Sequence, residues 1–220
     1  MPARMAHEQP RTTEAPSTKP VRRKSDITRE RILVAAATVF RTRGYSGTRL
    51  TEIAEMANMQ VGSLYYHFRS REALVAEVMA MGLEQTVEAY RAALADLPPE
   101  ADYPTRIRTA VEAHVLQLLQ PGAFPGAMFK LTAEVPPDLR EVHRAGERAY
   151  GHMWRDLLAE AQAAGVLRDG TDASVLRMLI VGAMNWTLEW FRPEKGDAEH
   201  VASQCADFVL HGILRAEAAT

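Results

Sequence analysis

The chain has 220 residues, of which 47% are hydrophobic and 25% are charged, so it can bury a sizeable core. A single cysteine, Cys205, excludes an intramolecular disulfide and a cysteine-based zinc site. The first 20 residues lack the apolar stretch of a secretory signal, and the longest apolar run, residues 176–191, is too short and too charged to span a bilayer. We therefore expect a cytoplasmic protein that stays out of the membrane.

Charge is distributed unevenly along the chain. Residues 1–72 hold 13 Lys and Arg against 7 Asp and Glu, whereas residues 73–220 hold 13 against 21. A basic N-terminal third on an acidic body is typical of a protein that meets a polyanion through its N-terminal part. A charge run is more often a solvated face, so this interpretation depends on the motifs that accompany it.

The first 25 residues are rich in Pro, Thr, Ser and charge, which predicts a disordered basic arm over residues 1–25. Its last part, Arg22 to Lys24, fits a DNA-contacting tail and a solubilising tail equally well.

Three short helices are predicted over residues 26–72. The first ends at Gly44, the second is expected to be capped by Thr48, and the third covers residues 61–68. The first has an apolar face of Ile32, Ala36, Val39 and Phe40. Two short helices joined by about three residues match a helix-turn-helix.

Longer helices are predicted in the rest of the chain. One is capped by Ser70 and runs to about Leu97, and others are expected at residues 105–120, 138–165, 172–191 and 198–216. Residues 121–137 are broken by Pro and Gly, so we expect irregular backbone there. No strand pattern is present, which predicts an all-α fold of about nine helices. We assign residues 73–220 to one effector-binding and dimerisation domain.

The third predicted helix carries an unusual polar and aromatic run, Tyr65, Tyr66 and His67, behind small residues. A helix in a DNA major groove needs small or polar side chains near the bases and hydrogen-bond donors for the flanking phosphates. A tyrosine pair alone is more often the edge of a core. Here it comes with helix-turn-helix spacing and a basic surround, which favours DNA binding.

Residues 28–75 resemble the DNA-binding domain of the TetR family of bacterial transcription regulators. The shared motifs are an apolar helix ending "F…GY", then "T…IA…A", then "GSLYYHF", then a basic residue, Ser, a basic residue, Glu and Leu. Gln60 stands where the family usually has a Ser or Thr cap, and Val61 where Lys or Arg is frequent. The resemblance implies a homodimer that places two recognition helices on a near-palindromic double-stranded DNA operator.

The resemblance also implies roles for single residues. It places Gln60, Val61, Ser63 and Tyr65 toward bases. It places Thr48, Tyr66, His67 and Arg71 toward phosphates. Independently of the resemblance, Val61, Gly62 and Ser63 are small enough to let the helix backbone come close to DNA.

The last two predicted helices have broad apolar faces, which we expect to pair with a second copy of the chain. A monomeric bundle that uses these faces internally is the alternative. The expected interface residues are Leu176, Leu179, Ile180, Ala183, Thr187, Val201, Cys205, Phe208, Val209 and Gly212.

A small-molecule effector is expected in the body, in a mostly apolar pocket with a few polar groups. The candidate lining residues are His114, Leu118, Phe124, Met128, Phe129, Tyr150, Trp154, Asn185 and Trp186. Ordinary core packing is the alternative for His114, Tyr150 and Trp154, and a place at the dimer seam is the alternative for Asn185 and Trp186. Residues 182–196 resemble a TetR subgroup that responds to acyl-CoA thioesters, and Arg144, Arg148, Arg155 and Arg177 are candidates for its phosphates. A drug or an aromatic compound is the alternative effector.

Enzyme motifs are missing from the sequence: it has no G-x-S-x-G, G-x-G-x-x-G, P-loop or H-E-x-x-H. Its seven histidines never fall at helical ligand spacing, so we predict no metal, no cofactor and no catalytic residue. A protein that binds DNA without sequence preference remains the alternative function.

Overall fold

The computed structural model describes residues 24–120 and 124–215. The predicted arm therefore lies outside the described residues, except for Lys24 and Ser25. Those two residues are helical, so the predicted arm extended two residues too far. Residue 216, the predicted end of the last helix, also lies outside the described residues.

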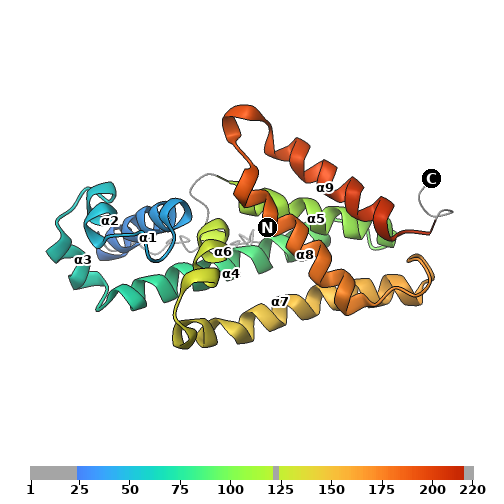
Figure 1. The fold of residues 1–220 in the computed structure, drawn as a ribbon, viewed down its shortest axis with the longest axis horizontal. Helices are drawn as coiled ribbons and strands as arrows, with labels where there is room; N and C mark the ends of the chain where they lie inside the picture. The colour runs from blue at the N-terminus through green and yellow to red at the C-terminus, as the bar shows by residue number, and fades with distance from the viewer. Residues whose placement is uncertain (1–23, 121–123, 216–220) are drawn as a thin grey trace, which may run out of the picture.

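Within the described ranges the chain is built from α-helices, with one short 3-10 turn and no β-strand, which confirms the all-α prediction (Figure 1). The elements are α1 (Lys24–Arg43), α2 (Leu50–Met56), α3 (Val61–His67), α4 (Arg71–Ala95), α5 (Tyr103–Leu119), α6 (Phe124–Glu134), α7 (Pro137–Ala163), α8 (Ala173–Trp190), η1 (Pro193–Lys195) and α9 (Ala198–Ile213). None of the described helices combines the length and the apolar character that a membrane crossing requires.

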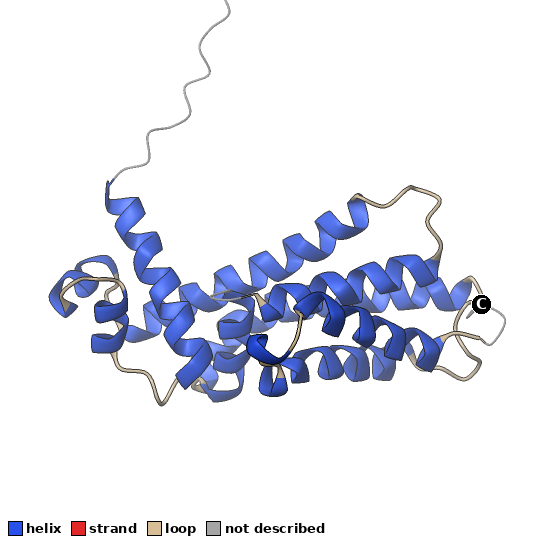
Figure 2. Ribbon diagram, turned by 90° about the horizontal axis from the view of Figure 1, so that it is seen from above, coloured by secondary structure: helices blue, strands red, loops and turns tan. Residues whose placement is uncertain are grey.

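Helices α1, α2 and α3 form a head at one end of an elongated molecule, and the remaining helices form its body (Figures 1 and 2). Helix α4 begins beside α3 and continues into the body. A rigid helix of 25 residues is roughly 37 Å long, so a shift at one end of α4 is felt at the other.

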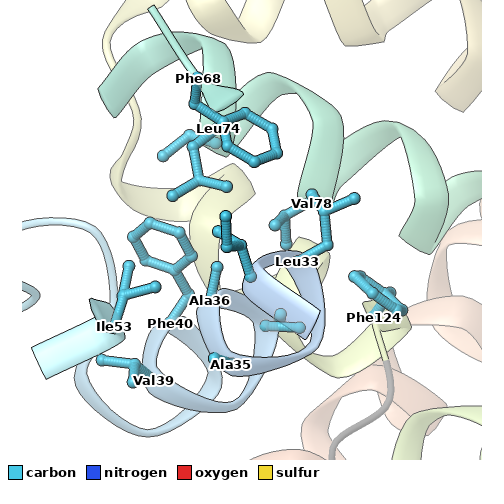
Figure 3. Close-up of a cluster of buried hydrophobic side chains, with 14 of the residues drawn as sticks. Leu33, Ala35, Ala36, Val39, Phe40, Ile53, Phe68, Leu74, Val78 and Phe124 are labelled. Atoms are coloured by element: carbon cyan, nitrogen blue, oxygen red, sulfur yellow. The ribbon is translucent and has the colours of Figure 1, made fainter. Parts of the chain in front are cut away.

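The head is held by a core of fully buried side chains from α1 to α4, among them Phe40, Ile53 and Leu74 (Figure 3). Leu64 of α3 belongs to the same core. Burial of such a side chain contributes about 1.5–3 kcal/mol. The same cluster includes Phe124 of α6, so the core continues past residue 72 into the body. The predicted boundary between residues 72 and 73 divides a single packed cluster.

Local sequence accounts for the ends of the head helices. Gly44 has φ +68°, a left-handed conformation that glycine adopts without strain, and α1 ends there as predicted. The hydroxyl of Ser70 accepts a hydrogen bond from the backbone N–H of Ala73 at 3.1 Å, so Ser70 caps α4 as predicted. Gln60 precedes α3 without capping it through its side chain.

Residues 124–134 form the regular helix α6, so the prediction of irregular backbone from Phe124 to Glu134 was wrong. Pro125 lies in the first turn, where its missing N–H costs nothing. The buried side of α6 packs closely on α4, because a Cβ at Gly82 would lie 2.6 Å from the Cβ of Met128. The proline and glycine that suggested a break are therefore compatible with a helix held by tertiary contacts.

A second core fills the body between α5, α7, α8 and α9. Trp154 of α7 is fully buried there, beside Ile107 and Val111 of α5. Helix α5 lies between its neighbours and is buried on the predicted face, including His114. Figure 1 shows α9 running along α5 and α7 along the opposite side of the body.

Candidate functional site

Helix α3 presents a polar surface at the tip of the head. Its only buried residue, Leu64, anchors it to the core, while Tyr65 is 52% exposed and Tyr66 is 85% exposed. The ring of His67 packs edge-on against that of Tyr66, with centroids 5.3 Å apart. Gln60, Gly62 and Ser63 are also exposed, and Val61 is half-buried.

Two residues expected to face phosphate make hydrogen bonds within the head instead. Thr48 is only 4% exposed, and its hydroxyl donates to the carbonyl of Gly44 at 2.7 Å, whereas Arg49 is the N-cap of α2. The guanidinium of Arg71 donates to the carbonyl of Tyr45 and lies 4.2 Å from the centre of its ring. Both side chains hold the turn between α1 and α2, which corrects the roles expected for Thr48 and Arg71.

Exposed arginines that the sequence reading missed lie beside α2 and α3. Arg49 opens α2 and Arg69 follows α3, and both are exposed. Arg43 is exposed too, although it pairs with Glu52 at 3.4 Å. The positions of Arg49 just before α2 and of Arg69 just after α3 were the sequence signal that could have identified these two residues. All three arginines strengthen the positive character of this end of the head.

The body contains a cavity of about 340 Å³ between α4, α5, α6, α7 and α8. Six predicted pocket residues line it: His114, Leu118, Met128, Phe129, Tyr150 and Asn185. The sequence reading missed the others, which are Leu83, Thr86, Thr132, Arg140, Glu147, Gly151, Arg177, Met178 and Val181. Because α4 and α6 contribute lining residues, a molecule in the cavity would contact the helices that also pack against the head.

His114 lies between two polar partners in the cavity wall. Its Nε2 is 3.1 Å from Oδ1 of Asn185 and its Nδ1 is 2.7 Å from the hydroxyl of Tyr150. Because an amide oxygen only accepts, Nε2 carries the proton and Nδ1 accepts from the tyrosine. Burial lowers the pKa of His114 to about 4, so the ring is neutral near pH 7. Burial also raises the pKa of Tyr150, which keeps that hydroxyl protonated.

Three predicted pocket residues lie elsewhere. Phe124 is 6% exposed and belongs to the head core. Trp154 is fully buried behind the cavity, with its ring centroid 6.4 Å from that of His114. Trp186 is 64% exposed on the outer face of α8, where it lines no part of the cavity. Helical spacing alone did not distinguish the cavity wall from the core behind it or the surface outside it.

Helices α8 and α9 leave an apolar surface exposed. Four predicted interface residues lie on it: Leu179, Ala183, Phe208 and Gly212. Three others, Leu176, Val201 and Cys205, are half-buried. The predicted residues Ile180, Thr187 and Val209 are 3%, 1% and 4% exposed and pack within the chain, so they are not available to a partner. Val175, Met178, Trp186 and Trp190 complete the exposed surface.

Two polar contacts tie the head to the body. Arg41 of α1 donates to the carbonyl oxygens of Gln120 and Leu119 at the end of α5. Glu134 at the end of α6 accepts the backbone N–H of Tyr45 at 2.8 Å and that of Ser46 at 3.3 Å. The turn after α1 is thereby bonded to the helix that forms one wall of the cavity.

Comparison with known proteins agrees with this arrangement along most of the chain. The model of "Bacterial regulatory proteins, tetR family" matches residues 32–78, and that of the "Tetracyclin repressor-like, C-terminal domain" matches residues 100–213. The HTH-type transcriptional repressor KstR2 of Mycolicibacterium smegmatis is 29% identical over 191 residues, which cover 86% of this chain and 92% of that protein.

Two solved structures share the fold. The ketosteroid transcriptional regulator KstR2 of Mycobacterium tuberculosis is 25% identical with a TM-score of 0.74, over 85% of this chain and 95% of that one. AibR, solved in complex with isovaleryl coenzyme A and operator DNA, is 22% identical with a TM-score of 0.72, over 85% of this chain and 98% of that one. One family model matches the head and the start of α4, and the other matches most of the body. The chain therefore belongs to the TetR family of bacterial regulatory proteins.

Proposed function

We propose that this protein is a dimeric transcriptional repressor that leaves its operator when a small, largely apolar effector fills the body cavity. The observation that carries the proposal is the cavity wall: Leu83 and Thr86 belong to α4, the helix that continues into the head. An occupant therefore contacts the element that positions α3. A ligand that fits one orientation of α4 better than another shifts the population of head positions.

DNA recognition is assigned to the exposed side of α3. Gln60, Val61, Ser63 and Tyr65 face the bases, and Tyr66 and His67 contact the phosphates. Gly62 lets the DNA backbone approach, since the structure leaves open space within 4 Å of where its Cβ would be. Exposed Arg49 and Arg69 replace Thr48 and Arg71 as the phosphate-binding donors.

Dimerisation is assigned to the exposed apolar surface of α8 and α9. Phe208, 74% exposed, and Leu179, 66% exposed, are large side chains that a partner would remove from water. Two copies related by a two-fold axis present two α3 helices, which favours a near-palindromic operator.

An acyl-CoA thioester is the effector class that we favour. The cavity has an apolar wall of Leu118, Met128 and Phe129 for an acyl chain, and neutral hydrogen-bonding groups at His114, Tyr150 and Asn185 for a carbonyl oxygen. AibR, which shares the fold, was solved with isovaleryl coenzyme A, and KstR2 is named a ketosteroid transcriptional regulator.

The test is fluorescence anisotropy with the DNA upstream of the protein's own gene and with scrambled DNA, at one salt concentration. A specific regulator prefers its operator by about 10³ or more. Release on addition of octanoyl-CoA supports the proposal. Binding that survives octanoyl-CoA keeps the regulator and removes this effector class, and equal binding to operator segments and scrambled DNA contradicts the regulator itself.

A further inference from the structure

A second cleft lies outside the cavity, between α7 and the start of α8. It has a volume of about 290 Å³. Its lining residues are Arg144, Glu147, Arg148, Gly151, His152, Arg155, Ser174 and Arg177. Four arginines against one glutamate make it strongly basic, on a body that is otherwise acidic. We call it the arginine cleft.

The arginines of α7 repeat along one side of the helix. Arg140, Arg144 and Arg148 stand four residues apart, and Arg155 follows two turns later. Like charges at this spacing repel one another, so the row destabilises the isolated helix. A row of repelling charges is compatible with a stable helix when an anion or a carboxylate lies against it.

Carboxylates of the chain compensate this row only in part. Arg144 pairs with Glu141 at 2.8 Å, and Arg155 is 4.0 Å from its neighbour Asp156. Arg148 has no hydrogen-bond or ion-pair partner in the described part of the chain, and Arg177 donates only to the sulfur of Met178, at 3.0 Å. By contrast, Arg29 and Arg108 elsewhere are paired with carboxylates.

The arginine cleft and the effector cavity share a wall. Glu147, Gly151 and Arg177 line both of them. Gly151 lets α8 place its arginine across α7, because a Cβ there would lie 3.0 Å from Nη1 of Arg177. The guanidinium of Arg177 therefore stands at the junction, with the apolar cavity on one side and the arginine row on the other.

We propose that the arginine cleft binds the phosphate groups of an organic phosphate whose apolar part occupies the cavity. This inference rests on the proposed function, whose effector it describes more closely: an amphipathic molecule with one apolar end and a polyphosphate end. Arginine forks match phosphate oxygens in geometry and charge. Arg177 lies where the two ends of the ligand join, and Arg144 and Arg148 hold the phosphates.

The test is isothermal titration of the full chain with four probes: octanoyl-CoA, octanoic acid, coenzyme A and inorganic pyrophosphate. The variant is R144Q/R148Q, since both side chains are exposed and their loss leaves the core intact. The matched control is R91Q, an exposed arginine within α4 that lines neither the cavity nor the cleft. Thermal unfolding of the apo proteins verifies that each variant is folded.

The wild type should bind octanoyl-CoA at least about tenfold more tightly than octanoic acid, and added salt should reduce that advantage. In R144Q/R148Q the affinity for octanoyl-CoA should fall at least about tenfold, while that for octanoic acid stays the same. Coenzyme A and pyrophosphate should bind weakly, compete with octanoyl-CoA and lose affinity in the same variant. R91Q should match the wild type with every probe.

Equal affinity of octanoyl-CoA for the wild type and R144Q/R148Q would overturn the assignment of the cleft and leave the proposed function intact. Pyrophosphate binding that depends on these arginines, with no gain from the octanoyl group, would show an independent anion site and overturn the link to the cavity. Failure of every phosphate probe to bind would overturn the proposed phosphate site. Operator binding measured on the same sample decides separately whether the regulator assignment stands.

Discussion

His114 shows how the body keeps a polar group inside an apolar environment. The ring is neutral, and each nitrogen has a partner: the amide oxygen of Asn185 and the hydroxyl of Tyr150. A buried polar group without partners costs roughly 1–3 kcal/mol, so the arrangement is tolerated because it is complete. In the proposed function, the same three groups are the hydrogen-bonding partners of the effector.

Acidification should reveal the burial of His114. The unfolded chain takes up a proton near pH 6.5, whereas the folded state, with a pKa of about 4, does so only at lower pH. The free energy of unfolding should therefore fall as the pH drops from about 6.5 to about 4, by up to about 1.4 kcal/mol per pH unit from this group. Urea unfolding of the wild type and H114Q at matched pH values measures it. The same pH slope in both proteins would contradict this origin.

Tyr66 is the single side chain best placed to test the DNA-binding role of α3. It is 85% exposed, so Tyr66→Phe removes only a hydroxyl and leaves stability unchanged. Loss of a hydrogen bond to a phosphate should weaken binding by about 1.5–3 kcal/mol, roughly tenfold or more. Because phosphate contacts carry no sequence information, operator and scrambled DNA should weaken by the same factor in anisotropy titrations. A loss confined to the operator would instead assign Tyr66 to the bases.

Helix α6 is the element on which head and body meet. It contributes Phe124 and Leu131 to the head core and Met128 to the cavity, and Glu134 bonds the turn after α1. Close packing of α6 on α4 depends on Gly82, where a Cβ would lie 2.7 Å from the carbonyl oxygen of Phe124. Gly82→Ala should force the two helices apart.

We expect Gly82→Ala to destabilise the protein by about 1–2 kcal/mol, because overpacking outweighs the gain in helix propensity. The control is Gly62→Ala in α3, where no atom lies within 4 Å of the added Cβ and stability should stay the same or rise. Chemical unfolding measures both variants. A stable Gly82→Ala protein would show that the contact between α4 and α6 is looser than the structure has it.

At the scale of the whole molecule, the exposed face of α8 and α9 is the surface that we propose for dimerisation. Phe208 and Val142 are both 74% exposed, but Phe208 lies on that face and Val142 on α7. Phe208→Ser should raise the dimer dissociation constant at least about tenfold, whereas Val142→Ser should leave it unchanged. Sedimentation over a range of concentrations measures both. Equal effects of the two substitutions would contradict the assignment of this face.

The sequence by itself determined the described helices other than α6, since apolar spacing and end signals such as Gly44 and Ser70 act within a few residues of the chain. It also indicated the exposed α3 surface, because the "GSLYYHF" run is contiguous. Only the tertiary structure decided which face of each helix is buried in a core, lines the cavity or lies exposed. It placed Trp186 outside the body and Ile180 inside it, made residues 124–134 a helix on α4, and brought Arg177 across Gly151. Those outcomes depend on contacts between residues far apart in sequence, which local periodicity does not encode.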